Sequence, residues 1–344
     1  MAKYAVRRGL AAIPVVFGVT LVTFLLIHFT QGSFVPGLDF NPSLRPEDIA
    51  RIRANLGLDR PWYVQYLDWI GIAFFFKAAG LAGILGGASK VGTGLLQGDF
   101  GRSMIDGSPV LAHIWERLPN TLELTVTAIL LGVVISIPLG VTGALRRGSK
   151  IDHFFTALSV AGFAVPAFWL GLILILLFSV SFHAWGLPWL PSSGVATPLT
   201  GGDLVDRVVH LLMPATVLSF VYLSIWSRYT RSSMLEVLSQ DYVRTARAKG
   251  MAERRVTYLH ALRNAVIPLA TLIGLELPGL VGGGLVVEVV FGWPGIGRLA
   301  FERALQYDVT TVMGITTFAA LLVIAGNLLA DLLYAMLDPR IRYT

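Results

Sequence analysis

The chain has 344 residues, of which 55% are hydrophobic and 14% are charged, and its formal net charge is +6. Charged residues usually make up about 25% of a soluble domain, so this composition excludes an ordinary soluble protein, and its apolar character excludes a disordered one. Cysteine is absent, which excludes disulfides, thiolate nucleophiles and cysteine-ligated metals.

Six apolar runs are long enough to cross a bilayer, whose hydrocarbon core of about 30 Å needs roughly 20 apolar residues in a helix. They are residues 10–29, 122–145, 154–182, 208–226, 265–291 and 312–337. The first is longer than the apolar part of a signal peptide and no clear cleavage site follows it, so we interpret it as a retained helix. Pro166 predicts a kink in the third, and Pro278 and the glycines at 282–284 interrupt the fifth. The sequence therefore predicts an all-α membrane protein with six transmembrane helices.

The distribution of basic residues predicts the orientation of these helices. Sixteen of the 27 Lys and Arg residues lie in segments that would face one side, together with both termini. Eight of the other 11 lie in the long segment 31–118, which counts little in the positive-inside rule. Both termini are therefore predicted to be cytoplasmic, and the basic excess indicates cytoplasmic loops rather than nucleic-acid binding.

Segment 31–118 is too long for a simple connection, so we expect a helical extracytoplasmic structure there. One short helix is predicted over 46–56, and a second begins at 59–63. Four aromatic residues suit a membrane interface: Trp62, Tyr63, Tyr66 and Trp69. Residues 70–96 are apolar but glycine-rich and carry two lysines, which predicts an interfacial or loop-packed helix, with a re-entrant hairpin as the alternative. The segment is either a structural cap or a surface for an external partner.

The predicted cytoplasmic loop 228–264 contains two short amphipathic helices that meet at a glycine. Asp241 is expected to cap a helix that runs to Lys249, and Gly250 suits a left-handed stop after it. A second helix is predicted over 252–264, where apolar side chains recur every three residues. The basic residues of this elbow suit either anionic lipid or a soluble cytoplasmic partner.

Four carboxylates fall within the predicted spans, where charges are costly and usually functional: Glu123, Glu276, Glu288 and Asp331. We take the last three as candidates for a translocation pathway, with structural pairing as the alternative. The sequence has no zinc-binding His-Glu-x-x-His motif, no Gly-x-Ser-x-Gly elbow and no phosphate-binding loop. Any ATP used in transport must therefore be handled by another chain.

The stretch DYVRTARAKGMAERRVTYLHALRNAVIP resembles the cytoplasmic coupling signature of binding-protein-dependent ABC importer permeases. Gly250 takes the place of the signature glycine, and residues 244–246 take the place of its Glu-Ala-Ala. His260 and Arg263 depart from the isoleucine and proline of that signature. Four other stretches resemble the B-type subunit of the dipeptide/oligopeptide branch: 98–103, 118–124, 288–298 and 337–343.

This resemblance implies the type I ABC importer permease fold in a bacterial cytoplasmic membrane. Residues 1–30 would form the cytoplasmic N-terminus and first helix, and 31–118 the extracytoplasmic segment, with 70–96 as an insertion. Residues 119–337 would form a five-helix core with the coupling loop 228–264, and 338–344 a cytoplasmic tail.

The resemblance also implies a second homologous permease chain, two ATPase subunits that hold ATP and Mg²⁺, and an external binding protein that delivers a peptide. No cofactor, active site or nucleic-acid partner is expected for this chain. Five residues are implied to contact the ATPase: Tyr242, Arg244, Thr245, Ala246 and Gly250. The alternatives are the same fold importing glutathione, nickel chelates or another peptide-like solute, and a stand-alone ion-coupled secondary transporter.

Overall fold

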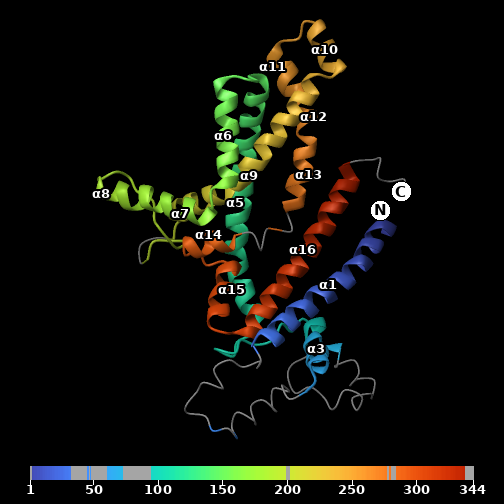
Figure 1. Ribbon diagram of the computed structural model, residues 1–344, viewed down its shortest axis with the longest axis vertical. Coiled ribbons are helices and arrows are strands. Elements are labelled where there is room, and N and C mark those ends of the chain that lie inside the picture. Colours follow the sequence, from blue (N-terminus) through green and yellow to red (C-terminus); the bar gives the residue numbers. More distant parts are fainter. Residues whose placement is uncertain are drawn as a thin grey trace. The chain divides into compact units, whose positions relative to one another are not determined.

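A computed structural model describes residues 2–31, 45, 47, 60–72, 94–198, 202–276, 279 and 284–337 (Figure 1). The regular secondary structure of these residues is helical and includes no β-strand, apart from one isolated bridge between Arg102 and Pro109. The chain divides into two compact units. One comprises Pro119–Arg298 and Ala325–Thr344, and the other Ala2–Leu118 and Leu299–Ile324.

Three long helices frame the first unit: α5 (Val110–Leu145), α6 (Lys150–Ala164) and α9 (Leu204–Leu238). α9 begins at the cap residue Asp203, whose carboxylate accepts the N–H of Asp206 at 2.8 Å. It continues far beyond the predicted run 208–226, because apolar residues in its last turns still have partners. Met234, for example, is fully buried against Val141 and Ala144 of α5.

Glycines allow α5 and α6 to lie close against α9. A Cβ atom on Gly140 of α5 would lie 2.5 Å from the Cβ of Thr230, and one on Gly162 of α6 would lie 1.9 Å from the Oγ of Ser224. Both distances are far shorter than van der Waals contact. Any larger side chain at these positions would therefore push the helices apart in a closely packed interior.

The core of this unit is apolar and aromatic. Tyr222 and Trp226 of α9 stack with their ring centroids 4.9 Å apart, and Trp293 is fully buried in the same cluster. Burial of such side chains contributes roughly 25 cal/mol for each Å² of apolar surface removed from water. In a membrane this gain applies only to surface that would otherwise face water. Surface that would otherwise face lipid gains stability from close packing instead.

An ion pair joins the first turn of α6 to α9. Arg231 donates from Nε and Nη2 to the carboxylate of Asp152 at 2.6 and 2.8 Å, and the N–H of Gly148 donates to the same carboxylate at 2.9 Å. These hydrogen bonds, chiefly those from Arg231, lower the pKa of Asp152 to about 2. Asp152 is therefore ionised at neutral pH although its side chain is buried.

The third predicted run is broken, which corrects the expectation of one kinked span over 154–182. α6 ends at Ala164, Val165 and Pro166 are extended, and α7 (Ala167–Leu174) begins after them. Proline lacks an N–H and disfavours helical geometry in the preceding residue, so the helix stops instead of bending. α7, η3 (Ile175–Ser181) and α8 (Phe182–Ala184) then run in a different direction from α6 (Figure 1).

Each of the six predicted apolar runs contains helix in the described residues. By length and composition, four helices in the described part of the chain could cross a membrane: Val110–Leu145, Ala167–Ala184, Leu204–Leu238 and Val309–Leu328. A fifth candidate is the bent pair Glu253–Ala265 and Ile267–Gly274, and Ile13–Leu26 is a shorter apolar helix. The count of six spans remains a prediction.

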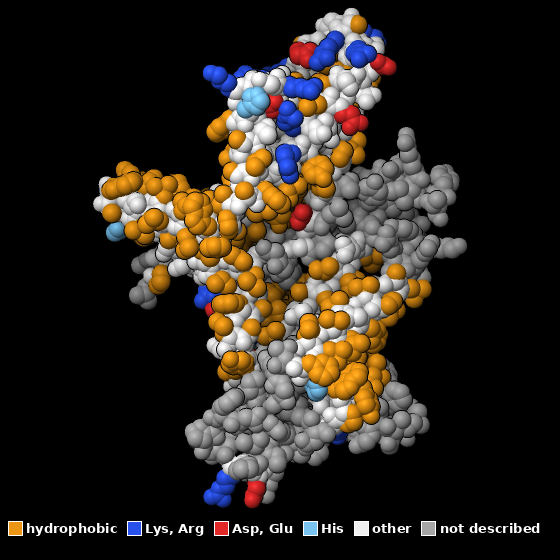
Figure 2. All heavy atoms as spheres, viewed as in Figure 1, with side chains coloured by type: hydrophobic (Ala, Val, Ile, Leu, Met, Phe, Trp, Pro, Cys, Tyr) orange, Lys and Arg blue, Asp and Glu red, His pale blue; other side chains and the backbone are white. Residues whose placement is uncertain are grey.

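Further helices follow α9 among the described residues. They are α10 (Asp241–Ala248), α11 (Glu253–Arg255), η4 (Val256–Ala261), α12 (Leu262–Ala265), α13 (Ile267–Glu276), α14 (Leu285–Val290), α15 (Ile296–Leu305) and α16 (Val309–Leu337). Figure 2 shows Lys and Arg side chains gathered at the end of the first unit that carries α10 and α11, while hydrophobic side chains cover the helices beyond it. Pro278, Gly282 and Gly283 lie outside the described residues.

The second unit contains α1 (Ala2–Gln31), α3 (Trp62–Ile70) and the short η2 (Leu95–Gln97). α3 begins directly after Pro61, as the sequence predicted. Tyr66 is buried against Phe24 of α1, and its hydroxyl lies 3.0 Å from that of Thr20. This residue therefore supports the packing of α3, whereas Trp62 and Tyr63 are exposed. The predicted helix 46–56 and most of 70–96 lie outside the described residues.

A buried aspartate ties the motif 98–103 to the start of α16 in this unit. Asp308 is fully buried and accepts hydrogen bonds from the hydroxyls of Ser103 and Thr311 at 2.6 and 2.7 Å. Arg303 lies between this carboxylate and that of Asp106, with its Nη2 2.9 Å from the Oδ2 of Asp106. The motif therefore holds a loop against residues about 200 positions later in the chain.

Candidate functional site

The predicted helix–glycine–helix elbow is present between α9 and α13. Its first helix, α10, begins at Asp241, and its second arm runs through α11, η4 and α12 to Ala265. Asp241 is not the capping residue, which corrects the sequence expectation. Gln240 occupies the cap position without a side-chain hydrogen bond, and the carbonyl of Asp241 accepts from the hydroxyl of Thr245 at 2.9 Å.

Gly250 turns the chain between the two arms. Its φ is +75°, a left-handed conformation that residues with a Cβ rarely adopt, and its N–H donates to the carbonyl of Arg247 at 2.9 Å. A Cβ built on Gly250 would meet nothing within 4 Å. The requirement for glycine is therefore one of backbone conformation and not of space.

Apolar residues hold the two arms of the elbow together. Val243 and Ala246 of α10 pack against Val256 of the second arm, and all three are buried. Ala246 therefore faces inward. Of the five residues implied to contact an ATPase, the other four are exposed: Tyr242, Arg244, Thr245 and Gly250.

Two polar contacts also connect the arms, and the sequence reasoning had identified neither. Arg247 donates to the carboxylate of Glu253 across the glycine, with its Nη2 2.6 Å from Oε1, and this contact lowers the pKa of Glu253. The amide of Asn264 donates to the hydroxyl of Tyr242 at 2.9 Å and to the carbonyl of His260 at 3.2 Å. The only sequence signal for the contact between Arg247 and Glu253 is their opposite charge at a separation of six residues. Nothing in the sequence indicates the contact between Asn264 and Tyr242.

Arg244 occupies the position at which the coupling signature of the ABC importer permeases more commonly has glutamate. Its nearest acidic partner is Asp241, with an Nη1–Oδ1 distance of 3.4 Å, and both side chains are largely exposed. Exposed ion pairs of this kind contribute at most about 1 kcal/mol. The guanidinium of Arg244 is thus accessible to an acidic partner.

A second constellation joins the motifs 118–124 and 288–298. Glu288 of α14 has 0% of its surface exposed, and its carboxylate accepts from the hydroxyl of Thr121 and from the N–H of Arg298, both at 2.8 Å. The hydroxyl of Thr121 in turn accepts the N–H of Ile296 at 2.8 Å. A Cβ on Gly295 would lie 2.2 Å from the carboxylate, so the backbone before α15 wraps directly around it.

Asn120 and Glu123 extend this contact along α5. The side-chain amide of Asn120 donates to the carbonyl of Pro294 at 3.0 Å, and the backbone carbonyl of Asn120 accepts from the indole of Trp293 at 2.8 Å. Glu123 and Asn120 both accept from the guanidinium of Arg207 on α9. The two motifs thus form one polar anchor, which we define as Asn120, Thr121, Glu123, Arg207, Glu288 and the backbone of 293–298.

The three pathway candidates lie in different surroundings. The polar anchor places Glu288 among structural hydrogen bonds, which favours the alternative of structural pairing for this residue. Glu276, the last residue of α13, is half-buried and makes no ion pair or hydrogen bond with the described residues. Asp331 lies on α16 in a part whose side chains are outside the description. Within the described residues no group of His, Asp and Glu could hold a metal ion.

Comparison with known proteins gives two family matches that together cover most of the chain. Residues 136–343 match the family described as binding-protein-dependent transport system inner membrane component. Residues 1–125 match the N-terminal region of the same kind of membrane component.

Curated relatives match over the full length of the chain. It is 43% identical to the oligopeptide transport system permease protein AppB of Bacillus subtilis (strain 168), over 100% of both chains. It is 37% identical to the dipeptide transport system permease protein DppB of Escherichia coli (strain K12) and 39% identical to the di/tripeptide transport system permease protein DppB of Pseudomonas aeruginosa (strain UCBPP-PA14). Both alignments cover 100% of this chain and 99% of the relative.

The polar anchor yields a prediction about stability. Replacing Glu288 with Ala leaves buried donors without an acceptor, and Gly295→Ala forces a methyl group into the carboxylate. Each variant should lower the free energy of unfolding by about 1–3 kcal/mol. Thermal unfolding of the purified protein measures both variants. Glu236→Ala on the exposed face of α9 is the control and should unfold like the unaltered chain. Unchanged unfolding temperatures for both Glu288→Ala and Gly295→Ala would contradict the anchor.

Proposed function

Because the chain belongs to the binding-protein-dependent transport system inner membrane components, we propose that it is the membrane-spanning permease subunit of an ATP-driven importer of dipeptides or oligopeptides. The observation that carries this proposal is the full-length identity of 37–43% to relatives named as dipeptide and oligopeptide permeases. The apolar helices and the basic elbow of the described structure fit the same role.

The elbow is the proposed point of contact with an ATPase subunit. Tyr242, Arg244, Thr245 and Gly250 form its exposed side, while the buried Ala246 sets the distance between its two arms. The second arm also packs on α9 and α5, because Ala261 and Ala265 share a cluster with Met234 and Val141. A push on the elbow would therefore reach two of the long helices directly.

The complete importer would contain several chains. A second homologous permease would share the pathway, two ATPase subunits would bind ATP and Mg²⁺ and hydrolyse ATP, and an external binding protein would deliver the peptide. Both termini and the elbow would lie on the cytoplasmic side of a bacterial inner membrane, as the distribution of basic residues predicts.

Glu276 is the proposed residue of the pathway. A half-buried carboxylate with no ion pair or hydrogen bond among the described residues costs free energy, so its presence in an apolar helix suggests a ligand of opposite charge. The ammonium group at the start of a peptide supplies that charge. Asp331 is a further candidate from the sequence alone.

Reconstitution tests the proposed function. Proteoliposomes that contain this chain, its permease partner, the ATPase subunits and the binding protein should take up a dipeptide only when ATP is present. Omission of any one component should abolish uptake. Uptake by this chain alone, driven by an ion gradient without ATPase subunits, would refute the proposal in favour of a secondary transporter. If glutathione or a nickel chelate competes for uptake and peptides do not, the proposed substrate would have to change to that solute.

Replacing Gly250 tests the role of the elbow in coupling. A β-branched residue is strained at a φ of +75°, so Gly250→Val should destabilise the turn by about 1–2 kcal/mol. We expect ATP hydrolysis to continue while uptake per ATP falls. Gly250→Asn is the matched control, since asparagine tolerates this conformation and should retain most of the coupling. Equal uptake per ATP in both variants and the unaltered protein would argue against coupling through this turn.

Replacing Glu276 tests the pathway. Glu276→Gln keeps the shape but removes the charge, and should reduce uptake of peptides with a free amino terminus by about tenfold through loss of one charge-assisted hydrogen bond. ATP hydrolysis should be measured in parallel, with Glu236→Gln as the control for an exposed glutamate. Identical uptake by the two variants would show that Glu276 is structural.

A further inference from the structure

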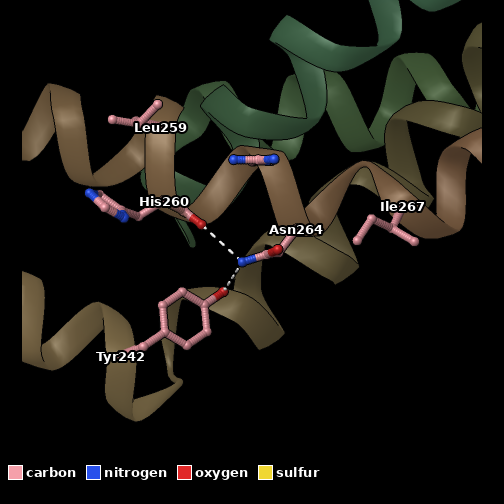
Figure 3. Close-up of a pocket in the computed structure, with 6 residues that line it drawn as sticks. Tyr242, Leu259, His260, Asn264 and Ile267 are labelled. Carbon is pink, nitrogen blue, oxygen red and sulfur yellow. Dashed lines mark hydrogen bonds between the residues drawn. The ribbon is translucent and has the colours of Figure 1, made fainter. Parts of the chain in front are cut away.

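A groove of about 500 Å³ is lined by residues of α10 and of the second arm of the elbow, and the coupling role leaves it unexplained. It is lined by Tyr242, Leu259, His260, Arg263, Asn264 and Ile267. Figure 3 shows Tyr242 reaching from α10 toward Asn264 on the second arm, with dashed hydrogen bonds from the amide of Asn264 to the hydroxyl of Tyr242 and the carbonyl of His260. Its size is that of a small-molecule site.

The polar groups of this groove suit an anion. Its lining has one full positive charge, from Arg263, and no acidic residue. Arg263 is exposed and makes no ion pair or hydrogen bond with the described residues. A planar guanidinium in a groove whose lining also includes the hydroxyl-bearing Tyr242 is suited to a phosphate group.

The apolar groups of the groove suit a hydrocarbon chain. Leu259 and Ile267 have 49% and 61% of their surfaces exposed although they lie beside the polar groups. Exposed aliphatic side chains next to an unpaired cation are unfavourable in water, but they match a ligand that carries a charged group and an alkyl chain together.

The position of the groove matches the boundary of a membrane. The helices Glu253–Ala265 and Ile267–Gly274 are bent by 40° at a short break and together could form one span. Pro268 has no N–H to donate to the carbonyl of Asn264, which accounts for a break at this point. Arg263 lies before the break and Ile267 after it, so the polar part of the groove precedes the apolar helix α13.

We propose that this groove binds the headgroup of an acidic phospholipid from the cytoplasmic leaflet, with the phosphate on Arg263 and an acyl chain along Ile267. Basic pockets beside membrane helices on the cytoplasmic side are known to hold such headgroups. The proposal rests on the membrane placement given under the proposed function. A bound lipid would link the elbow to the bilayer at the place where force from the ATPase enters the chain.

Native mass spectrometry of the complete transporter in nanodiscs tests the proposal. With phosphatidylglycerol present, the unaltered complex should retain the acidic lipid more strongly than phosphatidylcholine. Arg263→Gln should weaken this retention by about tenfold, as loss of a charge-assisted contact to phosphate implies. Arg254→Gln is the matched control, because it removes an exposed arginine of the same arm that does not line the groove. Arg263→Lys keeps the charge and should retain most of the lipid.

Several results would overturn the proposal. Equal retention of phosphatidylglycerol by Arg263→Gln and Arg254→Gln would place the lipid elsewhere. Equal retention of phosphatidylcholine would show that no acidic headgroup is recognised. A photocrosslinker at Leu259 that captures an ATPase or permease chain and no lipid would show that protein covers the groove. Peptide uptake measured on the same samples separates this outcome from failure of the proposed function, which would appear as absent uptake in the unaltered complex.

Discussion

The buried carboxylate of Glu288 is the interaction on which the first unit depends. It has no contact with water, and it is stabilised by the hydroxyl of Thr121 and the N–H of Arg298. A carboxylate in such a place is strongly unfavourable unless it is fully hydrogen-bonded, so the backbone around Gly295 must close on it. This requirement joins residues 167 positions apart in the chain and fixes where α15 begins.

At the other end of the same unit the elbow is held in a different way. Its arms meet through three small buried side chains, Val243, Ala246 and Val256, with polar contacts only at the edges. Small apolar contacts of this kind keep the two arms together and leave one face of α10 exposed. The anchor and the elbow are both attached to α5 and α9, which pack closely at glycines. The polar anchor and the apolar contacts of the elbow are thus attached to the same pair of helices, α5 and α9.

Much of the helical architecture could be predicted because hydrophobic length and proline positions act locally. Each apolar run contains helix in the described residues, α3 begins after Pro61, and Gly250 adopts the left-handed turn expected between two short helices. Pro166 indicated a kink but not whether the helix would bend or stop there, and the length of α9 could not be predicted because it depends on partners. Helix α9 continues to Leu238 since Met234 finds a buried place against α5, which no local pattern reveals.

The sequence by itself determined the class of protein, the apolar runs, the basic side and the two motifs of the candidate site, because composition and spacing do not depend on tertiary contacts. Only the tertiary structure decided what the singled-out residues do. It placed Ala246 inside the elbow and Tyr242 on Asn264, and it surrounded Glu288 with donors from two distant segments. The sequence pattern of a carboxylate in an apolar run is the same whether the side chain binds a substrate or accepts hydrogen bonds from structural donors. Only the neighbours brought by folding distinguish the two.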